Sequence, residues 1–254
     1  MITVGVSGAA GRMGRAVAET VASADDLTLQ AMYDPSAADA AEVNGARVAS
    51  DPEALNGCDV IVEFTRPDVV MENMATWRSF GSHAVVGTSG FDADRLATLR
   101  AAWGDGPPNC VVVSNFSIGA AVMMRLSEIA APHFAASEII ELHHDRKVDA
   151  PSGTALETAR RMGAVVDQRR AVDSEELVAG ARGAAVDGVH IHSVRLPGLI
   201  SHQEVLLGGP GETLSIRHDT TDIASFMPGI LLAVRSVADL PDAVTIGLES
   251  LLGL

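Results

Sequence analysis

Short β-rich runs alternate with helical patterns over residues 1–115, and this alternation narrows the possible folds more than any other feature of the chain. The β-rich runs occupy residues 2–6, 27–32, 60–64, 84–86 and 111–113, and the helical patterns occupy 13–24, 67–80 and 92–103. Right-handed crossovers join such strands into a parallel sheet with helices on both faces. We therefore predict an α/β fold built on a doubly wound parallel sheet.

The pattern changes after residue 115. A helical pattern at 119–131 leads to a strand at 138–142, a helix from about residue 154, and strand patterns at 190–196, 203–207 and 213–218. The turn Gly208-Gly-Pro-Gly211 predicts a hairpin between the last two strands, and the polar residues 167–188 predict a mobile excursion. A helix at 222–237 and a strand at 243–246 are expected to return to the first domain. We predict a discontinuous first domain (1–115 and 221–254) and a second, α+β domain (116–220) with a mixed or antiparallel sheet.

Charge and apolar content exclude several classes of partner. The formal net charge is −15, whereas nucleic acids and anionic membrane surfaces select basic faces, so neither is expected. No stretch approaches the ~20 apolar residues of a membrane span, and we expect no signal peptide before the first strand. Cys58 and Cys110 adjoin apolar runs, which predicts buried reduced thiols. We expect these cysteines to hold no metal cluster. The expected location of the protein is the cytoplasm.

A glycine-rich run, Gly8-Ala-Ala-Gly11-Arg-Met-Gly14, follows the first strand. Glycines there permit a tight turn and the close approach of a pyrophosphate to a helix N-terminus. Asp34 follows the second strand, where an acid accepts hydrogen bonds from ribose hydroxyls. The alternatives are a glycine turn that only packs helix on strand, and an Asp34 that only caps a turn before Pro35. The pattern predicts a Rossmann-like dinucleotide site with contacts from Gly8, Ala9, Ala10, Gly11, Arg12, Met13 and Asp34.

Three further turns follow predicted strands of the same sheet. The carboxyl ends of parallel strands form the ligand crevice of such folds, so these turns are expected to contact the nicotinamide and its ribose. Each turn taken alone could be only a loop. The residues concerned are Phe64, Thr65, Gly87, Thr88, Ser89, Ser114, Asn115 and Phe116.

The chain has one lysine, Lys147, against seventeen arginines, and it lies in a run that begins Glu141-Leu-His143-His144 and ends Pro-Ser-Gly-Thr154. A lysine ammonium can release a proton near neutrality, whereas a guanidinium cannot. Lysine beside two histidines therefore predicts proton transfer, although the histidines could be only a surface pair. Asp149 could orient Lys147 or cap the turn.

An anion site is predicted directly after this loop. Pro151 ends the loop, Ser152 is placed as the N-cap of the following helix, and Gly153 and Thr154 offer their amides to a ligand. Proton donors followed by an anion cradle suit a small polycarboxylate substrate.

Over essentially the whole chain, these motifs resemble those of the dihydrodipicolinate reductase family. The matching runs are Glu-Leu-His-His-x-x-Lys-x-Asp-Ala-Pro-Ser-Gly-Thr, Gly-Ala-x-Gly-Arg-Met-Gly, Gly-Thr-Ser-Gly and Asn-Phe-Ser-Ile-Gly. The resemblance implies a two-domain, NAD(P)H-dependent reductase of the diaminopimelate route to lysine, which acts on a small cyclic dicarboxylate. It implies a homotetramer assembled through the sheet of the second domain. It also implies proton donors at His143 and Lys147, and substrate contacts at His144, Ser152, Gly153 and Thr154.

Two positions depart from the family pattern. Pro35 and Ser36 follow Asp34, where members that use NADPH well often place an arginine, so we expect NADH to serve at least as well as NADPH. Arg12 could still reach a 2′-phosphate. The usual aspartate before Phe-Thr is Glu63 here.

Other classes of dinucleotide-binding protein share a glycine-rich loop of this kind. A short-chain dehydrogenase needs Tyr-x-x-x-Lys, but the only tyrosine, Tyr33, has Ala37 four residues later, which excludes that class. The open alternatives are another two-domain NAD(P)-dependent dehydrogenase, and a dinucleotide-sensing regulator that binds NADH without turnover.

Overall fold

A computed structural model describes residues 1–37, 42–43, 45–166 and 174–254. The chain divides into two compact units, Met1–Ser117 with Phe226–Leu254, and Ile118–Ser225. The first unit is discontinuous in sequence, with borders a few residues beyond the expected ones. Among the described residues no helix is both long and apolar enough to cross a membrane.

The first unit contains a six-stranded, fully parallel sheet in the order β13-β7-β6-β5-β1-β2. Its strands are β1 (Ile2–Ser7), β2 (Leu27–Tyr33), β5 (Val60–Glu63), β6 (His83–Val86), β7 (Cys110–Val112) and β13 (Val244–Ile246). In the central strands β5, β6 and β7 the β-branched side chains are buried on both faces, as in other sheets that helices cover on both sides. The predicted doubly wound parallel sheet is confirmed.

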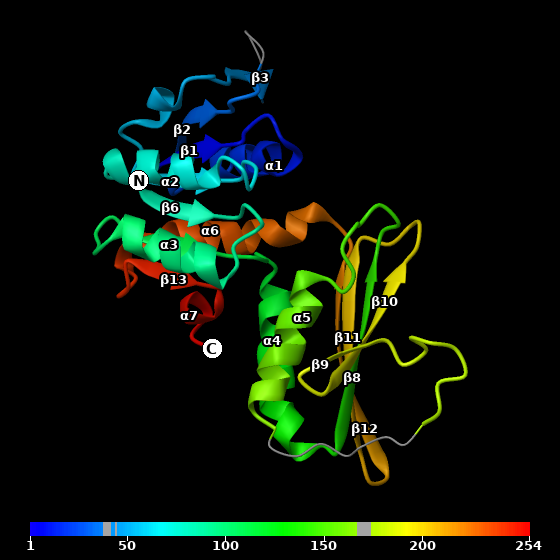
Figure 1. Ribbon diagram of the computed structural model, residues 1–254. Coiled ribbons are helices and arrows are strands. Elements are labelled where there is room, and N and C mark those ends of the chain that lie inside the picture. The colour runs from blue at the N-terminus through cyan, green and yellow to red at the C-terminus, as the bar shows by residue number, and fades with distance from the viewer. Residues whose placement is uncertain (38–41, 44, 167–173) are drawn as a thin grey trace. The chain divides into compact units, whose positions relative to one another are not determined.

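Helices cover both faces of this sheet (Figure 1). α1 (Arg12–Ala22) and α6 (Met227–Ser236) lie on one face, and α2 (Val70–Ser79) and α3 (Ala93–Trp103) lie on the other. Trp77, Ile61 and Leu99 are buried in the core between α2, α3 and the sheet. Cys58 and Cys110 belong to the same core and are unpaired, which confirms the expected buried thiols.

Several local elements differ from the sequence-based expectations. The helix expected from residue 67 begins at Val70, because the carbonyl of Arg66 accepts the amides of Val69 and Val70 and forms a turn first. The helix expected at 222–237 is a 3-10 turn (Ile223–Phe226) followed by α6, which starts where proline occupies the first helical turn. The sequence did not predict β3 (Glu42–Val43), β4 (Ala46–Arg47), the 3-10 helices Pro52–Leu55, Ala131–His133 and Val237–Asp239, or α7 (Glu249–Leu252).

The second unit contains a five-stranded mixed sheet in the order β12-β11-β8-β10-β9. Its strands are β8 (Ala136–His143), β9 (Ala184–Val186), β10 (Val189–Arg195), β11 (Ser201–Gly209) and β12 (Glu212–Thr220). β8 and β10 are parallel and the other pairs are antiparallel, which confirms the predicted second sheet. The β11–β12 hairpin turns between Gly209 and Glu212, as expected.

Two helices, α4 (Ile118–Ala130) and α5 (Gly153–Ala164), cover one face of this second sheet (Figure 1). Along β8 the burial alternates, and Ile139 faces the helices in a core with Met162 and Val205. Because strand side chains alternate between faces, Glu141 and His143 lie on the same face as Ile139.

The mobile excursion predicted for residues 167–188 is contradicted over part of its length. Residues 167–173 lie outside the described part of the chain. Residues 184–186 form β9, so the expected excursion is wrong there. Asp187 and Gly188 have φ angles of 48° and 78°, which fits a two-residue hairpin turn between β9 and β10.

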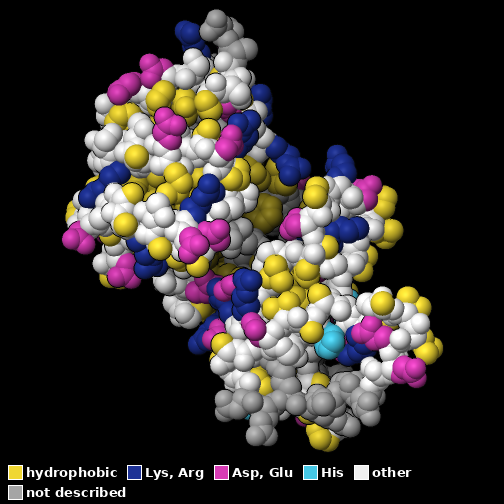
Figure 2. Space-filling model, viewed as in Figure 1, with side chains coloured by type: hydrophobic (Ala, Val, Ile, Leu, Met, Phe, Trp, Pro, Cys, Tyr) yellow, Lys and Arg dark blue, Asp and Glu magenta, His cyan; other side chains and the backbone are white. Residues whose placement is uncertain are grey.

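The charge of the first unit is not segregated on the face that Figure 2 draws. Acidic and basic side chains are interspersed over its helices. The net negative charge of the chain therefore does not form one block on that face.

Candidate active site

The glycine loop of the first unit leaves β1 through a turn that two glycines make possible. Gly8 has φ +79°, and a Cβ there would lie 2.6 Å from the carbonyl oxygen of Phe64. A Cβ on Gly14 would lie 2.1 Å from the carbonyl oxygen of Gly8. The amides of Gly8 and Ala9 donate to the carbonyl of Tyr33 at 2.8 and 3.1 Å. The loop is therefore bound tightly to the ends of β2 and β5.

α1 begins at this loop with an uncapped N-terminus. Its N-cap is Gly11, which supplies no capping side chain, and its first turn holds no acidic residue. The amides of Arg12 and Met13 begin the helix and have no acceptor within it. Such a terminus attracts anions, so the geometry fits a dinucleotide pyrophosphate.

Asp34 is buried against the same loop, with 6% of its surface exposed. Its carboxylate accepts the Ala10 amide at 3.0 Å, the Ser36 amide at 2.9 Å and the Ser36 hydroxyl at 2.6 Å. Asp34 thus shapes its own turn and also presents a fixed carboxylate beside the glycine loop. The two interpretations of Asp34 do not exclude each other.

The turns after β5, β6 and β7 meet in the first unit. The rings of Phe64 and Phe116 are 5.7 Å apart, and a Cβ on Gly87 would lie 2.2 Å from the Phe64 ring. The hydroxyl of Thr88 donates to the carbonyl of Thr65 at 3.2 Å. Phe116 is buried and packs beneath this junction.

The remaining predicted contacts of these turns differ in exposure. Ser89 and Ser114 are exposed, while Asn115 is half-buried and its side-chain oxygen accepts the Ser117 amide at 2.9 Å. Five of the eight predicted residues, Phe64, Thr65, Gly87, Thr88 and Phe116, are in direct contact with one another.

A buried carboxylate that the sequence analysis did not assign supports these turns. Glu63 is fully buried and accepts the Thr65 amide at 2.7 Å and the Trp77 indole N–H at 2.9 Å. It also accepts the Asn73 side-chain amide at 3.3 Å and the hydroxyls of Thr65 and Thr88. Glu63 therefore ties the ends of β5 and β6 to α2. Its position as the last residue of a buried strand was the available signal.

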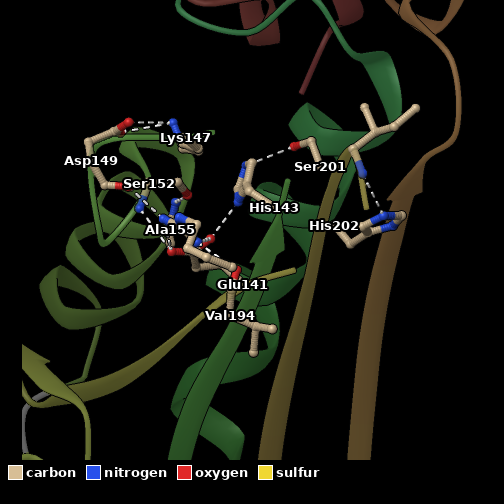
Figure 3. Close-up of polar contacts among 11 residues, drawn as sticks. Glu141, His143, Lys147, Asp149, Ser152, Ala155, Val194, Ser201 and His202 are labelled. Atoms are coloured by element: carbon tan, nitrogen blue, oxygen red, sulfur yellow. Dashed lines mark hydrogen bonds and ion pairs between the residues drawn. The ribbon is translucent and has the colours of Figure 1, made fainter. Parts of the chain in front are cut away.

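In the second unit, β8 presents Glu141 and His143 side by side on its helix-covered face (Figure 3). Glu141 Oε2 lies 2.5 Å from His143 Nδ1. The other ring nitrogen, Nε2, lies 3.0 Å from the hydroxyl of Ser201 at the start of β11. Both ring nitrogens of His143 are therefore held by defined partners.

Glu141 is fully buried and forms an ion pair with Arg195 at the end of β10. The two terminal guanidinium nitrogens donate to its two oxygens, each at 2.9 Å. Burial alone would raise the pKa of Glu141, but the hydrogen bonds from His143, Arg195 and Ser193 lower it to about 2. The carboxylate is thus ionised at neutral pH.

The loop between β8 and α5 carries Lys147. Its Nζ lies 2.8 and 2.9 Å from the two carboxylate oxygens of Asp149, and this ion pair lowers the pKa of Asp149. Asp149 therefore orients Lys147, one of the two possibilities left open by the sequence. His144 is half-buried, and within the described residues its Nδ1 has no hydrogen-bond partner.

α5 starts at the end of this loop with Ser152 as its N-cap, as predicted. The Ser152 hydroxyl accepts the Ala155 amide at 3.2 Å, and the Ser152 amide donates to Glu141 at 3.3 Å. Gly153 is exposed with open space where a Cβ would stand, and Thr154 follows it in the first turn. The helix N-terminus, Lys147 and His143 thus come from one chain segment that can bind an anion and donate protons.

Three contributors to this segment were missed from the sequence. Glu141 stands two residues before His143 on one strand, a spacing that places both side chains on the same face and could have been noticed. Arg195 and Ser201 come from other strands, so no local pattern pointed to them. No group of metal-ligating side chains occurs in the described part of either unit.

Comparisons with known proteins agree along the full length. The family description "Dihydrodipicolinate reductase, N-terminus" matches residues 2–116, and "Dihydrodipicolinate reductase, C-terminus" matches residues 119–252. The 4-hydroxy-tetrahydrodipicolinate reductases of Thermobifida fusca and Cutibacterium acnes are 50% and 48% identical, each covering 100% of both chains. The dipicolinate-bound dihydrodipicolinate reductase from Paenisporosarcina sp. TG-14 is 34% identical with a TM-score of 0.84, over 98% of this chain and 99% of that one.

Proposed function

The chain belongs to the dihydrodipicolinate reductase family, and we propose that it reduces 4-hydroxy-tetrahydrodipicolinate to tetrahydrodipicolinate with NAD(P)H, in the diaminopimelate route to lysine. It is an oxidoreductase of the two-unit plan described above. The observation that carries the proposal is the β8–α5 segment. In this segment His143 and Lys147 are followed by the N-terminus of α5. The dipicolinate bound to the Paenisporosarcina relative supports a small dicarboxylate as the ligand of this segment.

The reaction needs a hydride, a proton and a site for two carboxylates. The bound nicotinamide supplies the hydride. Replacing the 4-hydroxyl by hydrogen consumes one proton and releases water, so an acid must stand within reach of the ring. We assign proton donation to His143 and Lys147 without choosing between them. We assign the substrate carboxylates to Lys147, His144, Ser152 and the amides of Gly153 and Thr154.

For the cofactor, the family uses NAD(P)H, and we propose that NADH serves this chain at least as well as NADPH. Asp34 presents a carboxylate beside the glycine loop, which would repel a 2′-phosphate, and the next two residues, Pro35 and Ser36, carry no charge. Arg12 is exposed at the start of α1, and its guanidinium is the group that could bind the 2′-phosphate of NADPH. The other cofactor contacts, from the glycine loop and from the turns after β5, β6 and β7, stay predictions. A preference for NADPH of tenfold or more in kcat/KM, about 1.4 kcal/mol, would contradict this.

We also propose a homotetramer assembled through the sheet of the second unit. Ile140 and Leu142 of β8 and Leu206 of β11 lie on the face away from α4 and α5, because their neighbours in sequence face the helices. In Figure 1 both described α-helices of this unit, α4 and α5, lie on the other face of the sheet. A sheet face that carries these apolar side chains suits a symmetric partner.

The oligomer is tested by light scattering. The wild type should have the mass of a tetramer at micromolar concentration, and Leu206→Arg should dissociate it. Leu214→Arg is the matched control, because Leu214 lies on the neighbouring strand β12 but on the opposite face. A stable wild-type monomer would rule out the proposal.

A cytoplasmic location, expected from the sequence, stays a prediction.

The activity itself is tested with a dihydrodipicolinate synthase, pyruvate and aspartate semialdehyde as the source of substrate. Loss of NADH absorbance should require the complete mixture. A chain that binds NADH but leaves absorbance unchanged would instead be a dinucleotide-sensing regulator.

A further inference from the structure

Glu141 is a buried, ionised residue in the described part of the second unit, and the proposed reaction gives it no role. Its carboxylate receives donors from three directions: His143 on its own strand, Arg195 and Ser193 on β10, and the Ser152 amide at the start of α5. None of the Glu141 surface is exposed. Burying a carboxylate is costly unless its partners compensate it, so its contacts determine what it does.

The first consequence concerns the proton arrangement of His143. An ionised carboxylate only accepts hydrogen bonds, so the nitrogen that faces Glu141 must carry a proton. That nitrogen is Nδ1, 2.5 Å from Glu141 Oε2. Nε2 is left as the nitrogen that can gain and lose a proton, and its partner, the Ser201 hydroxyl at 3.0 Å, can either donate or accept (Figure 3).

The second consequence concerns the loop that carries Lys147. Arg195 Nη2 donates both to Glu141 at 2.9 Å and to the carbonyl of Asp149 at 2.6 Å. Asp149 in turn holds the Lys147 ammonium. Glu141 and Arg195 therefore anchor the last part of the β8–α5 loop, at Asp149 and at Ser152, and also the histidine that precedes the loop, His143.

We propose that Glu141, held by Arg195, is a positioning residue that fixes the ring orientation of His143 and keeps its proton on Nδ1, so that Nε2, beside the Ser201 hydroxyl, is the nitrogen that exchanges a proton. This inference rests on the proposed function, because it assigns Glu141 a role in the same reaction. Glu141 acts through His143 and contacts no substrate.

The same strand offers a matched comparison. Glu138, on the opposite face of β8, also binds one arginine and one histidine, Arg182 and His192. None of these three residues belongs to the proposed site, but Glu138 lies opposite Leu206 on the sheet face proposed for assembly, so the mass of Glu138→Gln is measured by light scattering beside its kcat. Glu138→Gln thus removes a carboxylate with the same kinds of partner on the same strand.

The first experiment compares Glu141→Gln with Glu138→Gln in steady-state kinetics. Removing a carboxylate that orients a catalytic histidine costs on the order of 10²–10⁴ in kcat, so Glu141→Gln should lose at least about 10². The fall in kcat should exceed any rise in the substrate KM, since Glu141 contacts no substrate and its largest effect falls on proton transfer by His143, while its anchoring of Ser152 and Asp149 affects binding less. Glu138→Gln should keep kcat within about twofold. Glu141→Gln turning over like the wild type would overturn the proposal.

The second experiment needs no activity and no variant. Ring ¹⁵N spectra of the wild-type histidines should show that Nδ1 of His143 stays protonated through the whole pH titration and that only Nε2 changes. A His143 whose neutral ring carries its proton on Nε2 would overturn the proposal, even if Glu141→Gln failed to fold. In a folded Glu141→Gln protein, the signals of the other histidines should be unchanged while the His143 ring loses its single proton arrangement.

The two results separate this inference from the proposed function. If the wild type shows no reductase activity but His143 keeps its proton on Nδ1, the proposed function fails and the Glu141–His143 geometry stands. If the wild type is active and Glu141→Gln is equally active, only the positioning role fails.

Discussion

Replacing Lys147 with arginine separates charge from proton donation at the proposed site. Lys147 Nζ lies 2.8 and 2.9 Å from the carboxylate oxygens of Asp149, a pairing that a guanidinium can keep. A guanidinium does not release a proton near neutrality. We therefore expect Lys147→Arg to fold and to bind NADH, but to turn over slowly.

The structure sets the size of each effect. The side chains of Lys147 and Asp149 are 22% and 59% exposed, and ion pairs at such positions contribute about 0–1 kcal/mol. A change of about 1 kcal/mol would move Tm by about 2–4 °C in a chain of this size. General acid catalysis contributes on the order of 10²–10⁴, so kcat should fall by about 10² or more. The loss of activity therefore cannot be explained by loss of stability.

The assay combines initial rates with amine labelling. An amine-selective reagent can modify only Lys147 and the N-terminus of the wild type, and only the N-terminus of Lys147→Arg, which serves as the control. Pyridine-2,6-dicarboxylate should slow the labelling of Lys147, and modification should abolish activity. If kcat of Lys147→Arg stays within about threefold of wild type, or full modification leaves turnover intact, the role given to Lys147 is wrong.

Three further predictions follow from buried carboxylates. Asp34→Ala should weaken NADH binding and improve NADPH relative to NADH, measured as the ratio of kcat/KM; an unchanged ratio would contradict the role of Asp34. Glu63→Gln should lower the free energy of unfolding by about 1–3 kcal/mol in denaturant titrations, because its amide NH₂ must replace either the oxygen that accepts the Thr65 amide or the oxygen that accepts the Trp77 N–H; an unchanged midpoint would contradict this. The pKa of Glu141 is about 2 when folded, against 4.5 ordinarily, so its contribution to stability is complete above pH 4.5 and is lost as the pH falls toward 2. Circular dichroism should show this acid loss in wild type and a weaker one in Glu141→Gln.

The sequence predicted the parts of the fold that depend on local patterns. The strand, glycine-loop and helix pattern around Gly8 and Gly14 was enough for the first unit, because the positive φ angle of Gly8 and the contact of Gly14 with Gly8 both lie within one strand–loop–helix segment. The hairpin turn near Gly211 was equally local. Short elements such as β9 were missed because their partners, and not their propensity, define them, although the Asp187-Gly188 pair was a usable turn signal.

The proposed site divides in the same way. The segment from His143 to Thr154 is continuous in sequence, so its candidate residues could be found without a structure. Arg195 and Ser201 reach His143 and Glu141 only because β10 and β11 flank β8 in the sheet. Glu63 was noticed only as a departure from a motif, since nothing in the sequence showed that Trp77 and Asn73 would donate to it.

The most direct test of the central claim is NADH oxidation by the wild type supplied with substrate from a dihydrodipicolinate synthase, pyruvate and aspartate semialdehyde. We expect rapid loss of absorbance that requires all components and whose rate falls by about 10² or more in Lys147→Arg. Absorbance that stays constant with the complete mixture, in a protein that binds NADH, would contradict the reductase activity proposed here.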